Sequence, residues 1–163
     1  MRAERVEVSY SSDSRIVWAE GGIAYAKTKG LSASEAESVA NTPEAWTYLR
    51  NGAASRIQAA MPTEMRSVMT GTRPVVVQIV VRNVYIAHAI QRILIGGDNT
   101  LVADVLIVDP KSKQVLSRLD NQTITSTAGQ GWGGVLIDAA FFSPAMDRLA
   151  VDFARQYRVW LQG

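Results

Sequence analysis

The segment that most constrains the fold is the valine-rich stretch 74–87, "PVVVQIVVRNVYIA". Apolar side chains at every second position from Val75 to Val81 would share one face of a strand, because successive side chains of a strand point to opposite faces. Val76 and Val80 add apolar groups on the other face, a pattern typical of a central strand that is partly covered on both sides. A central strand needs neighbours, so other segments must pair with it.

Two further strands follow this segment. "LVADVLIVD" and "VLSRLDNQTITST" are separated by "DPKSKQ", in which Asp109 and Pro110 are typical turn residues. The sequence therefore predicts adjacent antiparallel strands at residues 75–85, 101–108 and 114–125.

The N-terminal segment predicts a further strand. Val6, Val8 and Tyr10 alternate with polar residues, which is the period of a half-buried strand. "SSDS" at residues 11–14 is typical of a turn, and "RIVWAE" at residues 15–20 predicts a second short β-like piece.

Capping signals predict helices between the first strand and the valine-rich segment. Ser32 and Glu35 have the spacing of a capping box and start a helix near residue 33. Thr42 followed by proline is the start signal of a second helix, which runs over Pro43–Met61. Pro62 kinks or ends that helix.

Two apolar stripes indicate which helix faces are buried. The helix that begins at Pro43 carries Trp46, Leu49, Ala53, Ile57, Ala60 and Met61 on one face. A closing helix, 144–161, carries Met146, Leu149, Ala150, Phe153, Tyr157, Trp160 and Leu161. We therefore expect Trp46 and Trp160 in the core, Phe153 midway along the buried stripe, and Gln156 off it.

The order of the elements predicts the fold class. Hairpins join the later strands, and only the first strand needs a helical crossover. This order indicates an α+β fold, with a single, mostly antiparallel sheet of about four to five strands and helices packed on one face. The length of 163 residues fits a single domain over residues 1–163.

Composition excludes several kinds of chemistry. The chain has no cysteine, which excludes disulfides, cysteine-ligated zinc and a thiol nucleophile, and His88 is its only histidine. We expect no metal and no cofactor. A net charge of +2 gives no indication of nucleic-acid binding. No apolar run reaches the roughly 18 residues of a membrane span, and the first residues do not form a signal peptide.

A glycine-rich segment, "STAGQGWGG", is the one stretch that suggests a phosphate loop. Its glycines follow the pattern GxGxGG instead of GxGxxG, and no Gly-Lys-Ser/Thr follows, so neither a dinucleotide fingerprint nor a P-loop is present. We interpret it as a hinge, or as a contact loop that presents an aromatic side chain to a partner. The candidate contact residues of this loop are Gly129, Gly131, Trp132 and Gly133.

Six arginines and a single acid, Glu64, lie between Arg50 and Arg92. They are interpreted either as solvated side chains around a helix and a strand edge or as a basic face for an acidic partner or lipid headgroups. On the second interpretation Arg73, Arg82 and Arg92 join the candidate partner contacts.

Residues 45–161 resemble domains of bacterial envelope lipoproteins. The resemblance is carried by "GTRPVVVQIVVRNVYI", "LIGGDNTLVADVLIVDPKSKQVL", "AGQGWGG" and a closing helix that ends "YRVWL". Such domains are similar to the αβ modules of transport-auxiliary lipoproteins and to the amino-terminal domain of TolB. The resemblance implies an exported protein, periplasmic or associated with the outer membrane, anchored through an acylated cysteine upstream of Met1. It supplies no catalytic residues.

Three functional hypotheses remain open. The first is a non-enzymatic cell-envelope domain that works by binding or assembly, with a protein partner or a second copy and with a membrane surface reached through a native lipid anchor. The second is a subunit of a homo-oligomeric envelope ring or filament, with strand edges as contacts. The third is a cytoplasmic small-molecule enzyme that uses carboxylates and the basic region between Arg50 and Arg92, and it requires Met1 to be the native start.

Overall fold

The computed structural model describes residues 1–87, 98–127 and 144–162. The strands are β1 (Arg2–Trp18), β2 (Pro74–Ile86), β3 (Asp98–Val108) and β4 (Val115–Thr127). The helices are α1 (Ala19–Thr28), α2 (Ala36–Ala40), α3 (Pro43–Met65) and α6 (Ala145–Gln162), and a 3-10 turn covers Ala33–Glu35.

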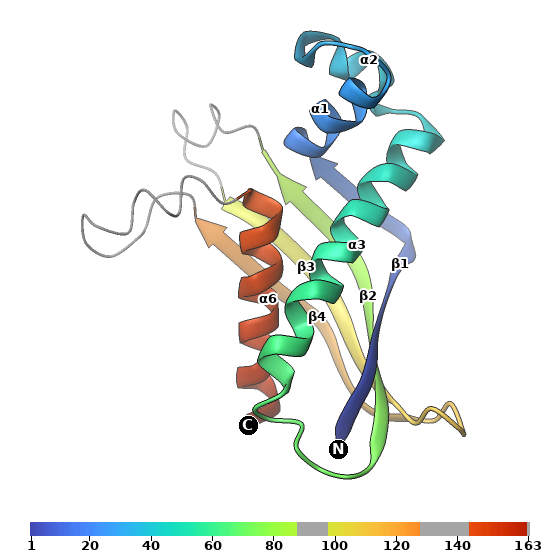
Figure 1. Cartoon of the computed structure of the whole chain (residues 1–163), viewed down its shortest axis with the longest axis vertical. Helices are drawn as coiled ribbons and strands as arrows, with labels where there is room; N and C mark the ends of the chain where they lie inside the picture. The colour runs from blue at the N-terminus through green and yellow to red at the C-terminus, as the bar shows by residue number, and fades with distance from the viewer. Residues whose placement is uncertain (88–97, 128–143, 163) are drawn as a thin grey trace, which may run out of the picture.

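One four-stranded sheet organises the described residues, in the order β1-β2-β3-β4. β2, β3 and β4 pair antiparallel, whereas β1 pairs parallel to β2. The helices α3 and α6 lie side by side on one face of this sheet (Figure 1). The predicted α+β class, the single mostly antiparallel sheet and the three adjacent strands are confirmed.

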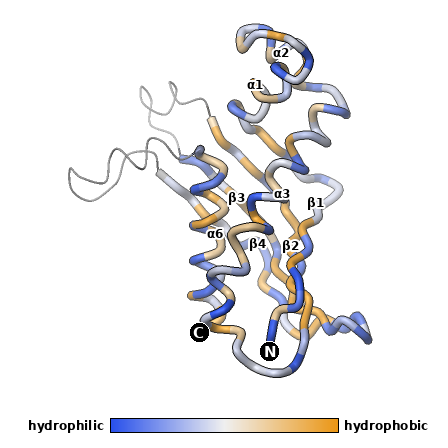
Figure 2. The backbone as a smooth tube through the Cα atoms, in the orientation of Figure 1, coloured by the Kyte–Doolittle hydropathy of each residue, from blue (hydrophilic) through white to orange (hydrophobic). Residues whose placement is uncertain are grey.

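The parallel pairing of β1 with β2 requires a crossover, and the helices from α1 to α3 provide it. Alternate apolar residues of β2 are fully buried in the main core: Val77, Ile79 and Val81. This face of β2 is therefore the one turned toward α3 and α6. Figure 2 shows β2 as a mostly hydrophobic strand, and it shows hydrophobic and hydrophilic residues alternating along α6. Both patterns place the core between the helices and the sheet.

The predicted turn at residues 11–14 is wrong, because β1 continues through it. The pairing shifts there: Tyr10 lies opposite Val81, but Arg15 lies opposite Asn83, so β1 bulges. Contacts with α3 hold the bulge, since the Tyr10 hydroxyl donates to the Arg50 carbonyl oxygen at 2.6 Å and Arg50 Nη2 donates to Ser14 Oγ at 3.1 Å. A polar run on an edge strand can stay extended when a neighbouring helix supplies its partners.

The helix α1 was not predicted from the sequence. It follows directly from Trp18, which is buried and packs against it. Gly21 is needed at this contact, because a Cβ atom there would lie 2.5 Å from Trp18 Cδ2 and 2.7 Å from Leu49 Cδ2. Packing between α1, Trp18 and α3, a tertiary effect, therefore explains a helix that its own "GGIAYAKT" sequence specifies weakly.

The helix α3 starts as predicted and extends further than expected. Thr42 Oγ1 accepts a hydrogen bond from the Ala45 amide at 3.2 Å, which confirms the N-cap. Pro62 lies inside the helix, which ends only at Met65. The stripe is buried at Leu49, Ala53, Ile57 and Met61.

The expectation that Trp46 lies in the core is wrong, because its side chain is 46% exposed. The first turn of α3 lies at the end of the sheet beside α1 and α2 (Figure 1), so only part of its surface is covered. On α6, Phe153 is fully buried and Trp160 is half-buried, with its ring edge-on to Phe153 at 6.1 Å between centroids.

Candidate functional site

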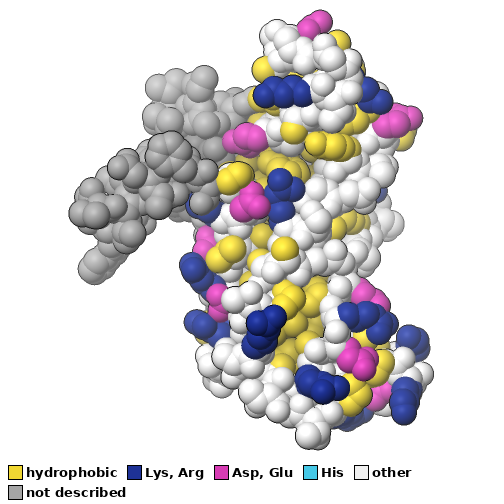
Figure 3. Space-filling view, in the orientation of Figure 1, with side chains coloured by type: hydrophobic (Ala, Val, Ile, Leu, Met, Phe, Trp, Pro, Cys, Tyr) yellow, Lys and Arg dark blue, Asp and Glu magenta, His cyan; other side chains and the backbone are white. Residues whose placement is uncertain are grey.

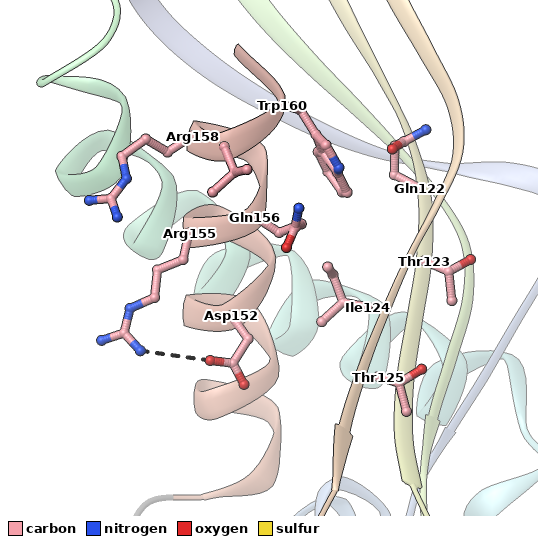
Figure 4. A pocket seen from close by; sticks show the side chains of 10 residues that line it. Gln122, Thr123, Ile124, Thr125, Asp152, Arg155, Gln156, Arg158 and Trp160 are labelled. Carbon is pink, nitrogen blue, oxygen red and sulfur yellow. Dashed lines mark ion pairs between the residues drawn. The ribbon is translucent and has the colours of Figure 1, made fainter. Parts of the chain in front are cut away.

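A groove of about 580 Å³ runs between α6 and the edge strand β4, and it is called here the β4–α6 groove. It is lined by Gln122, Thr123, Ile124, Thr125, Asp152, Arg155, Gln156, Arg158, Val159 and Trp160. Figure 4 shows Gln156 and Trp160 on α6 directed toward β4, and Ile124 directed back toward α6. Thr123 and Thr125 point away, so the strand contributes its backbone at those positions.

Ion pairs near both of its ends join α6 to α3. Asp147 at the start of α6 pairs with Arg56 of α3 at 3.3 Å, and Arg158 near its end pairs with Glu64 of α3 at 3.0 Å. These ion pairs, together with the buried stripe around Phe153, hold α6 against α3 and the sheet. Gln122 of β4 faces the helices but is polar, so β4 is left only loosely covered.

Among the described strands, β4 is an edge strand. It is the last strand in the sheet order, and no strand in the described ranges pairs with its outer side. Half of the backbone N–H and C=O groups of an edge strand point away from its single neighbour and can bond to an added chain. The groove therefore combines an available strand edge with a helical wall.

The two arginines that line the groove differ in how closely they are paired with acidic residues. Arg158 makes the short 3.0 Å pair with Glu64. Arg155 is 61% exposed and lies 3.7 Å from Glu64 and 3.8 Å from Asp152, distances beyond a good hydrogen bond. Figure 4 shows Arg155 on the side of α6 away from β4, so its guanidinium keeps donors available for a carboxylate at the outer rim of the groove.

A second polar cluster lies on the face of the sheet that no described helix covers. Asp104 of β3 is 3% exposed and receives two hydrogen bonds from Arg82 of β2, at 2.9 and 2.6 Å. The Asn121 amide donates to Asp104 Oδ1 at 2.9 Å, and Arg118 lies 3.7 Å away. The Arg82 guanidinium lowers the pKa of Asp104 below its usual value, and the Asn121 and Arg118 contacts act in the same direction, although burial opposes them.

Irregular backbone assembles this cluster. The β2–β3 pairing shifts at Val81–Asn83, and the β3–β4 pairing shifts at Ala103–Val105. Asn121 adopts a positive φ of 52°, which turns its amide toward Asp104. The buried carboxylate of β3 thus has partners on both β2 and β4, and the cluster ties these three strands together.

The two described arginines among the predicted contacts do not form one site. Arg73 precedes β2 and pairs with Asp109 at 3.1 Å, whereas Arg82 pairs with Asp104. Nine residues of extended strand separate them by about 30 Å. The other predicted contacts lie outside the described residues: Gly129, Gly131, Trp132, Gly133 and Arg92, as does His88.

The arginines between Arg50 and Arg82 serve different parts of the fold. Arg50 lies over the Tyr10 ring, 5.4 Å from its centroid, and Arg56 lies over the Trp18 ring at 4.9 Å. Within the described segments, no group of three or more His, Asp or Glu residues could hold a metal ion. Among the described helices, none combines the length and the hydropathy needed to cross a bilayer.

The residues of the β4–α6 groove were not identified as a site from the sequence. Trp160 was expected in the core, and Gln156 was noted only because it lies off the buried stripe. One signal was present: Gln156 and Asp152 are polar residues at i, i+4 beside that stripe, a spacing that places both on one helix face. Nothing in the sequence indicated that this face lies beside β4.

No protein-family model matches the chain, and no curated protein matches it in sequence. The crystal structure of a "putative lipoprotein" from Caulobacter crescentus CB15 is similar over 68% of this chain and 84% of its own, with 13% identity and a TM-score of 0.41. Lipoprotein GNA1162 from Neisseria meningitidis is similar over 86% and 93%, with 19% identity and a TM-score of 0.30. Likenesses of this degree assign no function to this protein.

Proposed function

We propose that this chain is a non-enzymatic domain of the cell envelope that binds an extended segment of a partner protein in the β4–α6 groove. The observation that carries the proposal is the groove itself, in which the unpaired edge of β4 lies beside a helical wall. An edge strand next to a helix is the arrangement that proteins use for strand addition, where main-chain bonds give affinity and side-chain contacts give specificity.

The bound segment would lie as a fifth strand beside β4. Alternate side chains of a strand point to opposite faces, so every second residue of the partner would face α6. There it would meet the apolar surface of Ile124 and the half-buried Trp160, with the Gln156 amide between them. A preference for small or apolar side chains at alternate positions follows.

The charged residues of the groove indicate which charge the partner segment should carry. Arg155 has donors available, whereas Arg158 is engaged by Glu64. An acidic side chain of the partner that reaches across α6 to the outer rim of the groove would therefore bind Arg155 and compete with Asp152. The partner segment is expected to be extended, to have no proline in its central residues, and to carry an aspartate or glutamate on the side facing α6.

A displayed peptide library tests this specificity. Peptides selected on the protein should alternate in polarity and carry an acidic residue, and Arg155→Glu should weaken their binding at least tenfold or so, because like charges would then face each other. Lys27→Glu makes the same charge change on the exposed surface of α1, far from the groove, and should leave binding unchanged. Equal losses for the two variants would contradict a local role for the groove.

Amide hydrogen exchange tests the mode of binding. Strand addition should protect amides of residues 122–126 at every second position, because only those that point away from β3 gain a partner. Protection confined to α1 and α2, or absent from β4, would overturn the proposal. The same titration, followed by sedimentation, reports self-association: a β4–β4 dimer without peptide would make a second copy the occupant and favour the oligomeric hypothesis.

The glycine-rich segment joins the two walls of the groove in sequence, since it lies between the end of β4 and the start of α6. A contribution of Trp132 to partner binding therefore stays a prediction. Trp132→Ala should weaken binding of the selected peptides and leave the unfolding free energy nearly unchanged.

The envelope location is supported by the resemblance of residues 45–161 to envelope lipoprotein domains. It is tested in the native host by fractionating cells that express the gene from its natural start. Recovery in the membrane fraction with incorporated fatty acid is expected. Recovery in the cytoplasm, without fatty acid, would remove the envelope from the proposal and leave the groove to be judged on its own.

A further inference from the structure

A second, smaller hollow lies at the end of the molecule where both chain termini are found (Figure 1). It has a volume of about 220 Å³ and lies between the first residues of β1 and the last turn of α3. Apolar side chains form part of its lining: Ala3, Val6, Pro62, Met65 and Met69. Figure 3 shows hydrophobic side chains gathered toward this end, with basic side chains around them.

Arginines surround the hollow. Arg2, Arg5 and Arg66 belong to its lining, together with a single acid, Glu4. Arg5 is engaged by Glu7 at 2.7 Å. Arg2 and Arg66 are exposed and, within the described segments, form no ion pair, so their guanidinium groups are available to an anion.

The surrounding surface has the same sign of charge. The segments that meet at this end, 1–7, 64–73, 109–114 and 158–162, contain seven arginines and lysines against four acids, a net charge of +3. The opposite end, formed by residues 19–44, contains two lysines against four glutamates, a net charge of −2. The two ends of the described chain therefore carry net charges of opposite sign, although the overall net charge is small.

From this combination we infer that the end carrying Arg2 and Arg66 is a docking surface for an anionic lipid bilayer. A basic surface alone would suit many acidic partners. An apolar hollow within the basic rim fits an amphiphile, whose phosphate would bind the guanidinium groups while its acyl chain contacts the partly exposed Val6 and Pro62. Arginine suits this position, because its aliphatic stem lies along apolar surface while its charged group reaches the phosphates.

The surface is also rigidly connected to the fold. The Gly71 amide donates to the Met1 carbonyl oxygen at 3.0 Å, and the Arg2 amide donates to the Arg73 carbonyl oxygen at 2.7 Å. These bonds tie the first residues of β1 to the segment between α3 and β2. Docking would therefore orient the whole sheet, with the α1–α2 end directed away from the bilayer.

Vesicle flotation tests the inference. The protein should bind vesicles that contain phosphatidylglycerol at low ionic strength, lose that binding at high ionic strength, and ignore pure phosphatidylcholine vesicles. The double change Arg2→Glu with Arg66→Glu should weaken binding more than roughly tenfold, since each basic residue near such a surface contributes roughly fivefold. The matched change Lys27→Glu with Lys29→Glu, at the other end, should leave binding intact, and an equal loss would overturn the inference.

A fluorescent probe locates the contact. The chain has no cysteine, so Ala3→Cys and Ser38→Cys each provide one attachment site for a polarity-sensitive dye. The dye at position 3 should shift to shorter wavelength with anionic vesicles, and the dye at position 38 on α2 should not. The reverse result would place the contact at the wrong end.

Competition distinguishes a bilayer from a small anion. Glycerol phosphate at millimolar concentration should leave vesicle binding nearly unchanged, because it lacks the acyl chain and the multivalent surface. Full displacement would show a simple phosphate site and overturn the inference. Arg155→Glu should float normally, so failure of this inference and failure of the groove proposal are separate results.

Discussion

The two faces of the sheet achieve stability by different means. On the face covered by α3 and α6, buried apolar residues recur at every second position of β2 and β3, as at Val77, Ile79 and Val105. On the other face, β3 buries Val108 and a carboxylate, Asp104, which is held by Arg82 and by the Asn121 amide. The covered face depends on many small contacts, whereas the face that no described helix covers combines the buried Val76 and Val108 with one ionic centre.

This difference determines how each face responds to change. A packed apolar face distributes its free energy over many contacts, so a single truncation costs in proportion to the volume it removes. A buried ion pair contributes much of its free energy through a few bonds, because removal of the carboxylate or of the guanidinium leaves hydrogen-bonding groups without a partner. The largest effects should therefore come from large side chains on the covered face and from Asp104 on the other.

The strongest test of the covered face is Phe153→Ala. Phe153 is fully buried on α6 and contacts the ring of Trp160 edge-on. The substitution should lower the free energy of unfolding by about 3–5 kcal/mol, measured by chemical denaturation. Gln156→Ala, one turn along on the groove side, should cost less than about 0.5 kcal/mol. Similar midpoints for the two variants would show that the assignment of the buried face of α6 is wrong.

The matching test of the uncovered face is Asp104→Ala. The variant loses the charge-assisted bonds from Arg82 and the acceptor for the Asn121 amide, so the free energy of unfolding should fall by about 2–3 kcal/mol. Asp120→Ala removes an exposed carboxylate that pairs with the exposed Arg118, and should cost less than about 0.5 kcal/mol. A loss at Asp120 equal to that at Asp104 would contradict a single ionic centre.

The dependence on pH separates the charge of Asp104 from its shape. Because the folded-state pKa of Asp104 is lowered, its stabilisation is present above the unfolded-state pKa of about 3.9 and is lost as pH falls through the folded-state value. The difference in unfolding free energy between the natural protein and Asp104→Asn should be constant near neutrality and shrink at acidic pH. Urea unfolding from pH 7 to pH 2 measures it, and a difference that grows on acidification would have the wrong sign.

Most of the fold could be predicted because its signals are local and periodic. The alternation in β2, the turn at Asp109, the N-cap at Thr42 and the stripe through Phe153 each specify an element by its own sequence. These predictions are confirmed. The continuous β1 and the helix α1 were missed because contacts with α3 decide them: Arg50 supports the β1 bulge, and Trp18 packs on Gly21.

The candidate sites could not be predicted because they depend on pairs of elements distant in sequence. Gln122 and Gln156 line the β4–α6 groove from different elements, and Arg2 and Arg66 likewise line the apolar hollow. The arginine-rich region suggested a common basic face, yet Arg56 and Arg82 serve ion pairs in different parts of the fold. No periodic sequence pattern predicts that such residues lie near each other, because their positions in space depend on the crossover and on the bulges.

The smallest effect is expected for Trp46→Ala, which tests whether the first turn of α3 is covered by other parts of the protein. Trp46 lies on the predicted buried stripe of α3, but its side chain is 46% exposed at the first turn, beside α1 and α2. Trp46→Ala should therefore change the free energy of unfolding by less than about 0.5 kcal/mol. Trp160→Ala, which removes a half-buried ring and its contact with Phe153, should cost about 1–2 kcal/mol. Denaturant midpoints of the two variants decide the matter: if Trp46→Ala costs as much as Trp160→Ala, the first turn of α3 is covered in solution, and the covered layer extends past the end of the sheet.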